Sequence, residues 1–253
     1  MQPFVDDELV GRPFRTSEGL ACGLSRHDMG TALWNAPHHG VRAWALSAAD
    51  DPVHRIRAVA ALLPGGGAIG GWAAAYLLGA RAVDGRGAYG MGAEPVLVAA
   101  PPTRPVRRPR IAVLQSPLDG ADVVEVAGIR VTAPLRTAFD LARTRSLPEA
   151  VVALDAMAAV GLLRLADVSA YVDRRSGWRG VPRARAAVGL ADPATRSPGE
   201  SRLRVMWVSE ARLPRPAVNA ESPVGTDTCW ASLTCSIRSP GSSRSTTAPI
   251  TGD

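Results

Sequence analysis

Lysine is absent from this sequence of 253 residues, so arginine supplies all 29 of its basic Lys-plus-Arg positions. Aromatic residues reach only 5% and cysteines number three, against 25 glycines and 21 prolines. This bias favours residues with G- and C-rich codons, so it reflects the base composition of the gene before it reflects function. A formal net charge of +6 and a pI near 10.2 permit a nucleic-acid partner without establishing one. The balance of 46% apolar and 21% charged residues excludes a coiled coil, a collagen and a fully disordered chain.

The three cysteines are too few and too scattered for a disulfide framework or a zinc site, and we expect no metal site in this chain. Residues 1–10 carry acidic but no basic side chains, which argues against a secretory signal. Residues 58–80 hold no charged side chain and are long enough to span a bilayer. The proline and glycines at 64–67 and 70–71 would break such a helix, so two short buried helices joined by a tight turn are expected instead. We therefore expect a cytoplasmic protein with no membrane partner.

Local signals near the N-terminus predict a small winged-helix-like unit. Residues 16–23 can form a short helix, and Ser25 with Asp28 three residues later is a start signal for a second helix. A small hairpin is expected within 34–44, with its turn at 38–40.

A mixed region of strands and helices is predicted to follow. Asp51 is a suitable N-cap for the first of these helices, Ala127-Gly128 is a hairpin turn signal, and Ser146 begins a capping box with Glu149. The elements expected here are helices over 52–63 and 72–78, strands over 95–100, 111–115, 123–126 and 129–132, and, after Pro134, helices over 150–160, 165–174, 181–190 and 198–211. Trp72, Phe139 and Leu141 are predicted core residues.

Two groups of residues are candidates for contact with DNA phosphates. Ser25, Arg26 and His27 precede the second predicted helix, whose N-terminus would favour phosphate; a solvated helix start is the alternative. The densest basic cluster lies in a proline-rich loop, which can equally be a solvated loop. This loop cluster consists of Arg104, Arg107, Arg108 and Arg110. Arg42 is a further predicted DNA-binding residue and completes the set. The His38-His39 pair is a weak metal signal and fits a surface turn better.

Seven short stretches of the chain share an order and spacing with a known family. They are GLSRHD at 23–28, IGGWAAA at 69–75, DVVEV at 122–126, GIRVT at 128–132, PLRTAFDLAR at 134–143, SPGESRLR at 197–204 and LPRP at 213–216. Together they resemble actinobacterial proteins that join an AbiEi-like antitoxin N-terminal region to an endonuclease-like domain related to very-short-patch-repair nucleases. The resemblance covers about residues 13–220. It implies an antitoxin-like, DNA-binding function, with a cognate toxin as a possible partner.

In that family the C-terminal domain looks like a PD-(D/E)XK nuclease, whose clustered carboxylates hold Mg²⁺ to polarise the phosphate and generate hydroxide. The resemblance implies a Glu on the leading helix, an Asp after a strand turn and an E-x-D on the next strand. Glu200 matches the first position, but nothing after Glu221 matches the others. An ordinary helix-cap role beside Ser197 is the alternative for Glu200. We therefore expect no cofactor for this chain, whereas intact relatives would use Mg²⁺.

A shifted reading frame offers a reason for the missing carboxylates. Residues 221–253 contain 13 serines and threonines among 33 positions, without periodicity, which is the composition of a disordered tail. We back-translated residues 229–252 with G or C preferred at wobble positions. In the shifted frame, each new codon consists of the third base of one codon and the first two bases of the next. Translated in this frame, the segment can encode LLGVPDLLDPVAGLVAEYDGAHHRG. This string carries both missing motifs in the family's order, so we hypothesise a frameshift near 220–222, in the gene or in its sequencing.

These observations predict an α+β protein. The expected parts are a winged-helix-like unit at 13–80, a mixed strand and helical region at 81–192, a truncated restriction-endonuclease-like remnant at 193–220 and a disordered tail at 221–253. The predicted function is that of a DNA-binding, antitoxin-like or transcriptional regulatory protein without catalytic activity. The alternative is a Mg²⁺-dependent endonuclease whose catalytic strands are lost in this chain. The oligomeric state stays open.

Overall fold

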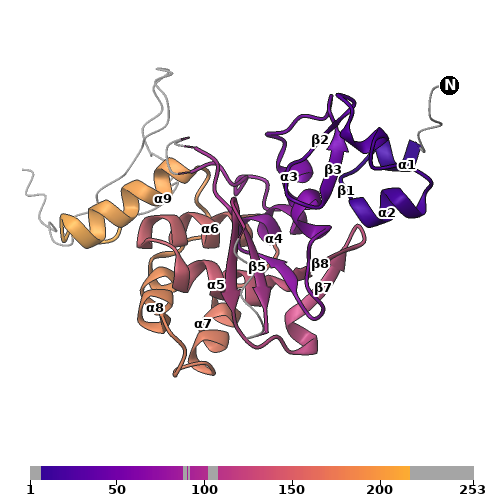
Figure 1. The fold of residues 1–253 in the computed structure, drawn as a ribbon. Coiled ribbons are helices and arrows are strands. Elements are labelled where there is room, and N and C mark those ends of the chain that lie inside the picture. The colour runs from indigo at the N-terminus through magenta and orange to yellow at the C-terminus, as the bar shows by residue number, and fades with distance from the viewer. Residues whose placement is uncertain (1–6, 88–89, 91, 102–107, 217–253) are drawn as a thin grey trace, which may run out of the picture.

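The computed structural model describes residues 7–87, 90, 92–101 and 108–216, so the predicted tail, Arg104 and Arg107 lie outside the described residues. Helices and two separate sheets make up the described part, which confirms the α+β fold class. Figure 1 shows a small N-terminal unit, residues 7–44, beside a larger body in which a sheet is flanked by helices.

The N-terminal unit has a three-stranded antiparallel sheet in the order β1-β3-β2. Its elements are α1 (Asp7–Val10), β1 (Phe14–Arg15), α2 (Thr16–Ala21), the 3-10 turn η1 (Asp28–Gly30), β2 (Trp34–Asn35) and β3 (Val41–Trp44). The predicted hairpin is therefore confirmed. The unit has its own small core, in which Trp34 packs edge-to-face between Phe14 at 5.1 Å and Trp44 at 5.4 Å.

The prediction of a second helix starting at Ser25 is wrong, because only the 3-10 turn η1 forms there. The Ser25 hydroxyl donates to Asp28 Oδ2 at 2.7 Å, and the Asp28 backbone N–H donates back to Ser25 Oγ at 3.1 Å. The chain leaves η1 at Thr31 in an extended conformation, and Met29 and Trp34 then both reach the small core. The start signal is thus real, but packing ends the helix after one turn.

The larger body is built on a five-stranded mixed sheet in the order β6-β5-β4-β8-β7. Pairs β4–β8 and β5–β6 are parallel, whereas β4–β5 and β7–β8 are antiparallel. Its elements are α3 (Pro52–Ala60), β4 (Ala68–Gly70), α4 (Gly71–Leu78), β5 (Val96–Ala100), β6 (Ile111–Gln115), η3 (Gly120–Asp122), β7 (Val123–Val126), β8 (Ile129–Thr132), α5 (Pro134–Thr144), α6 (Leu147–Ala159), α7 (Leu165–Asp173), α8 (Val181–Leu190), α9 (Pro198–Val205) and the π-helical turn η4 (Met206–Glu210). Most of the predicted elements are therefore confirmed.

The expected tight turn between two helices at 58–80 is wrong, because strand β4 lies there at the centre of the sheet. Ile69 pairs with Val98 on one side and with Val131 on the other. All three β4 residues are buried, and a side chain on Gly71 would press on Leu97. This strand is too short and too rich in small residues to show a period of its own, since its partners come from distant segments. In the described residues no helix is long and apolar enough to cross a membrane.

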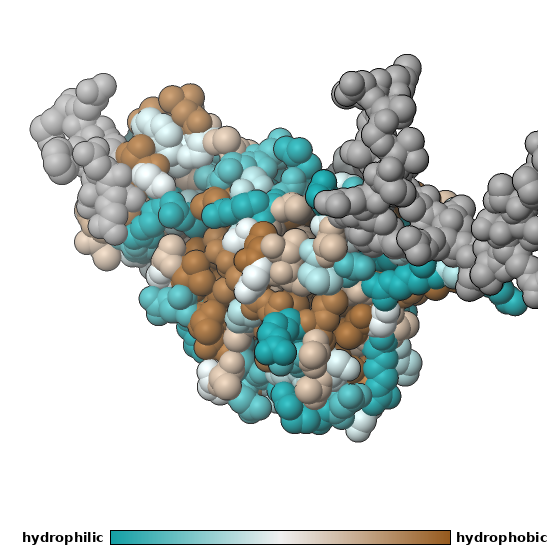
Figure 2. All heavy atoms as spheres, turned by 180° about the vertical axis from the view of Figure 1, so that it is seen from behind, coloured by the Kyte–Doolittle hydropathy of each residue, from teal (hydrophilic) through white to brown (hydrophobic). Residues whose placement is uncertain are grey.

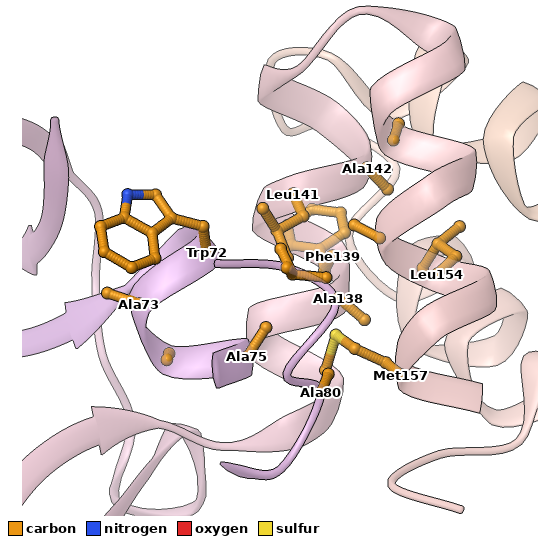
Figure 3. Packing of buried hydrophobic residues seen from close by; sticks show 14 of the residues in the cluster. Trp72, Ala73, Ala75, Ala80, Ala138, Phe139, Leu141, Ala142, Leu154 and Met157 are labelled. Atoms are coloured by element: carbon orange, nitrogen blue, oxygen red, sulfur yellow. The ribbon is translucent and has the colours of Figure 1, made fainter. Parts of the chain in front are cut away.

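The main core lies where α4 meets α5 and α6. Figure 3 shows Trp72 of α4 and Phe139 of α5 in this region, with Leu154 and Met157 of α6 on the adjoining helix. Each of these four side chains is at most 2% exposed. The indole N–H of Trp72 donates to the Pro95 carbonyl at 2.8 Å, so the ring is buried without an unsatisfied donor. The core roles predicted for Trp72, Phe139 and Leu141 are confirmed.

A buried charge network accounts for the charged residues of the PLRTAFDLAR stretch. Arg136 is 0% exposed and bonds Asp140 Oδ2, Asp122 Oδ2 and the Pro117 carbonyl, each at 2.8 Å. Asp140 also accepts from Arg143, and the Tyr171 hydroxyl donates to Asp122 at 2.6 Å. The charges on one face of α5 therefore tie that helix to the loop before β7 and to α7.

Helix α9 is fixed to α6 by a second buried ion pair, between Arg204 and Asp155. The Ser201 hydroxyl donates to the same carboxylate at 2.6 Å. Glu149 binds both the Nε and the Nη2 of Arg202, at 2.7 and 3.1 Å, and Ser146 makes no capping bond. The capping box predicted at Ser146 is therefore wrong, because the glutamate serves a partner from a distant helix.

Hydrophobic and hydrophilic residues are unevenly distributed over the surface of the molecule. Seen from behind, hydrophobic residues gather in the middle of the molecule between hydrophilic ones (Figure 2). Edge strand β6 contributes half-exposed apolar side chains from Ile111 to Leu114. The face seen in Figure 2 therefore has an apolar area with hydrophilic residues on either side of it.

Candidate nucleic-acid interface

The turn of the β2–β3 hairpin contacts the end of the basic loop that was predicted to contact DNA. Arg108 Nη1 donates to the backbone carbonyl of His39 at 2.6 Å, although the two residues are 69 positions apart. Residues 36–40, Arg108 and Arg110 therefore form one surface, which we call the hairpin–loop surface. The structure brings together two features that the sequence showed only separately.

Positive charge on the hairpin–loop surface has no acidic partner in the described part of the chain. Arg108 is half-buried and Arg110 is exposed, and neither forms an ion pair within residues 7–87, 90, 92–101 and 108–216. Burial lowers the pKa of His38, and the nearby charges of Arg108 and Arg110 lower it further. His38 is therefore neutral at pH 7, and the two guanidiniums supply the charge.

Arg110 adopts a left-handed backbone conformation, with φ of 62°. Arginine rarely occupies this region, which favours glycine and asparagine. The Arg110 carbonyl accepts from the Val96 N–H at 3.0 Å, so the start of the β5–β6 ladder holds the residue in place. This conformation presents a long cationic side chain where the backbone alone would favour a glycine.

The turn at Ser25–His27 offers basic side chains but no helix terminus. Arg26 and His27 are exposed, whereas the Ser25 hydroxyl is occupied by Asp28. The hydrogen bonds from Ser25 hold the pKa of Asp28 below its usual value, so a carboxylate lies close to this turn. A three-residue 3-10 turn does not supply the dipole of a full helix, so any phosphate contact here depends on Arg26 and His27.

Arg42 links this turn to the hairpin. It lies on β3, half-buried, and its Nε donates to the Met29 carbonyl of η1 at 2.9 Å. The guanidinium also lies 3.3 Å from the Val41 carbonyl. Arg42 therefore holds two parts of the N-terminal unit together, with only part of its guanidinium free for a ligand.

Glu200 lies in the first turn of α9, where it acts as a helix cap. Its backbone N–H donates to Ser197 Oγ at 3.2 Å, and its carboxylate accepts from the Arg196 N–H at 3.0 Å. No group of three His, Cys, Asp or Glu side chains that could hold a metal is found within the residues that the structure describes. The positions of the other expected acids fall after Glu221, outside the described residues.

Two hollows that the sequence did not predict adjoin the N-terminal unit. One, of about 170 Å³, lies beneath the hairpin–loop surface and includes His54 and Arg55 of α3. The other is an open groove of about 670 Å³ between α2, the end of α3 and the β7–β8 turn, lined by Arg12, Arg15, Glu18 and Arg57 among others. Arg12 pairs with Glu18, and Arg15 donates to the Ala61 carbonyl, so much of the charge in the groove is already bound. The smaller hollow is lined by Arg110, whose guanidinium has no hydrogen bond or ion pair among the described residues.

Comparisons with known proteins give no match. No protein-family model fits the chain, and neither a curated protein nor a solved structure matches it. Function is therefore inferred from the chain's own residues and their geometry.

Proposed function

We propose that this protein is a DNA-binding, antitoxin-like regulator that contacts the phosphate backbone through the hairpin–loop surface and the turn at Arg26–His27. The observation that carries this proposal is the bond from Arg108 to the His39 carbonyl, which joins the basic loop to the hairpin. Arginine side chains clustered on one surface, without acidic partners, are what sequence-independent phosphate binding needs. DNA is the partner, and no catalytic step is part of the proposal.

The order of elements in the N-terminal unit supports a winged-helix reading. The unit runs helix, strand, helix, 3-10 turn, strand, strand, with a sheet in the order β1-β3-β2. In such a unit the β2–β3 hairpin would be the wing, and the 3-10 turn η1 would stand where a recognition helix is expected. A three-residue turn is too short to lie in the major groove as a helix and contact several base edges. The wing and the arginines beside it would therefore carry most of the contact.

The proposal predicts a measurable dependence on salt. Each phosphate neutralised on duplex DNA contributes about −0.9 to the slope of log K against log salt concentration. Contacts from Arg26, Arg108 and Arg110 alone would give a slope of about −3. Additional contacts from arginines outside the described residues would make the slope steeper.

The test is fluorescence anisotropy of a labelled duplex, titrated with protein at salt concentrations from about 50 to 200 mM. Replacing Arg108 and Arg110 by alanine is expected to weaken binding at every salt concentration and to reduce the slope by about two. The matched control is Arg164→Ala with Arg185→Ala, which removes the same charge from exposed ion pairs with Asp167 and Asp173. Equal slopes for the two double variants would refute the proposed interface.

The proposal of a toxin partner is based on the family resemblance alone, and it needs a separate test. Co-expression with the product of the adjacent gene, followed by purification through a tag on this chain, is expected to yield a complex if the protein is an antitoxin. DNA binding without such a complex would favour a transcriptional regulator that acts on its own.

A further inference from the structure

The 170 Å³ cavity beneath the hairpin–loop surface joins the N-terminal unit to the larger body. Its walls come from residues 35–38 at the hairpin, from α3, and from the start of β5 and the end of the basic loop. The apolar part of the wall includes Pro37, Ala58 and Val59, and the polar part includes His38, His54 and Arg110. A mostly apolar hollow with a few convergent polar groups is the usual form of a small-molecule site.

The polar groups of this cavity are available for a ligand. In the described part of the chain no hydrogen bond or ion pair engages the imidazoles of His38 and His54 or the guanidinium of Arg110. Burial lowers the pKa of both His38 and His54, so each ring is neutral at pH 7 and can donate through one nitrogen. Asn35 lies on the same wall, and its buried Oδ1 is an acceptor without a hydrogen-bond partner in the described residues. The donors of His38, His54 and Arg110 can therefore bind the oxygens of a ligand, and Asn35 can accept from a hydroxyl or amine on it.

A second arginine, Arg55, adds positive charge to the cavity wall. Arg55 lies on the same wall, where it donates to the Gly85 and Glu94 carbonyls and stacks over Trp72 at 4.8 Å. Burial lowers the pKa of Arg55, and the charge of Arg110 lowers it further, so the two guanidiniums repel each other. Asp50, Asp84 and Glu94 oppose this effect, but none of the described residues that line the cavity carries a carboxylate. An anion bound in the cavity would reduce this repulsion.

The volume limits the ligand to a small molecule. An apolar cavity of about 150 Å³ admits a molecule the size of benzene. The present cavity therefore fits one ring or a short chain, with its charged end toward Arg110 and its apolar part against Pro37, Ala58 and Val59.

We propose that this cavity is a binding site for a small organic anion, a carboxylate or phosphate ester about the size of one aromatic ring. Arg110 would bind the charged group, and His38 and His54 would donate hydrogen bonds to its oxygens. The site does not require DNA binding, so it stands or falls independently of the proposed function.

The experiment is isothermal titration calorimetry on the full chain without DNA, using benzoate, phenyl phosphate and the neutral benzoate analogue benzamide. We expect saturable one-to-one binding of at least one of the two anions and no saturable binding of benzamide. The anion that binds more tightly distinguishes a carboxylate source from a phosphate source. Binding of benzamide as tight as that of benzoate, or no saturable binding of either anion, would overturn the proposal.

Variants separate this site from a general attraction of anions to a basic protein. Arg110→Ala and His54→Ala are each expected to weaken the anion about ten- to a hundredfold, as expected for the loss of a hydrogen bond to a charged group. Ala49→Leu, at an exposed position of the cavity wall, should block entry without disturbing the core. Arg185→Ala is the control for charge alone and should leave affinity unchanged. If Ala49→Leu and Arg110→Ala remain folded by circular dichroism and bind as wild type does, the site is refuted.

Discussion

The buried network around Arg136 makes a strong prediction about stability. Replacing Arg136 by methionine keeps much of the side-chain volume but removes three hydrogen bonds of 2.8 Å, to Asp140, Asp122 and the Pro117 carbonyl. Breaking a buried ion pair by removing one partner costs about 3–5 kcal/mol, because a buried charge is left without compensation. Here Asp140 keeps Arg143 and Asp122 keeps Tyr171, so a cost of about 3 kcal/mol is expected.

Urea denaturation at pH 7, followed by tryptophan fluorescence, measures this cost. Arg136 lies 5.3 Å from the centre of the Trp178 ring, so Trp178 is one of the tryptophans whose emission changes when the network is lost. With an m value of about 2–3 kcal/mol per molar urea, the midpoint should fall by about 1–1.5 M. The control is Arg185→Met, whose exposed pair with Asp173 should be worth about 0.5 kcal/mol or less. A cost for Arg136→Met no greater than that of the control would refute the assigned role of the network.

Three further predictions concern pH, backbone conformation and catalysis. Desolvation acts to raise the pKa of Asp122, but hydrogen bonds from Tyr171, the Asp119 N–H and Arg136 bring it below its ordinary value. The stability that Asp122 contributes is therefore fully present above the ordinary pKa of an aspartate. It is lost as the pH falls through the lower pKa of Asp122 in the folded protein. The free energy of unfolding of Asp122→Asn should therefore lie below wild type at pH 5 and approach it toward pH 2, and a constant gap would contradict this. Gly180 has φ of 87°, and a Cβ there would lie 2.5 Å from the Arg143 carbonyl oxygen. Thermal melts of Gly180→Ala should therefore show a loss of about 2 kcal/mol or more in the free energy of unfolding. Gly177 has open space around it, so Gly177→Ala should cost far less in the same measurement. Plasmid incubated with the protein and Mg²⁺ should stay intact, and cleavage that disappears in Glu200→Ala would favour the endonuclease alternative.

Local signals in the sequence predicted most of the helices and hairpins, because the residues that decide them are neighbours. Asp51 does cap α3, accepting from the His54 N–H at 2.8 Å, and Pro52 opens that helix. Ala127 and Gly128 both have positive φ, of 48° and 74°, as a tight hairpin turn requires. Where distant segments compete, local signals fail. Strand β4 depends on partners from two other segments, so no local pattern shows it.

The candidate site was predictable only in pieces. The sequence showed a basic loop and a histidine turn, but their contact through Arg108 spans 69 residues and depends on the fold. The cavity needs His54 and Arg55 from α3, which carry no motif of their own. Ser25 is the opposite case, where a correct local signal suggested a phosphate-binding helix that packing does not allow to form. Residue types can be read from a sequence, whereas their convergence is a property of tertiary structure.

The most direct test of the proposed function is the salt dependence of DNA binding by wild type and by the Arg108→Ala, Arg110→Ala double variant. The proposal predicts a steep negative slope for wild type and a slope smaller by about two for the variant, with the Arg164→Ala, Arg185→Ala control close to wild type. A wild-type chain with no salt-dependent affinity for duplex DNA, or a variant with the wild-type slope, would contradict it.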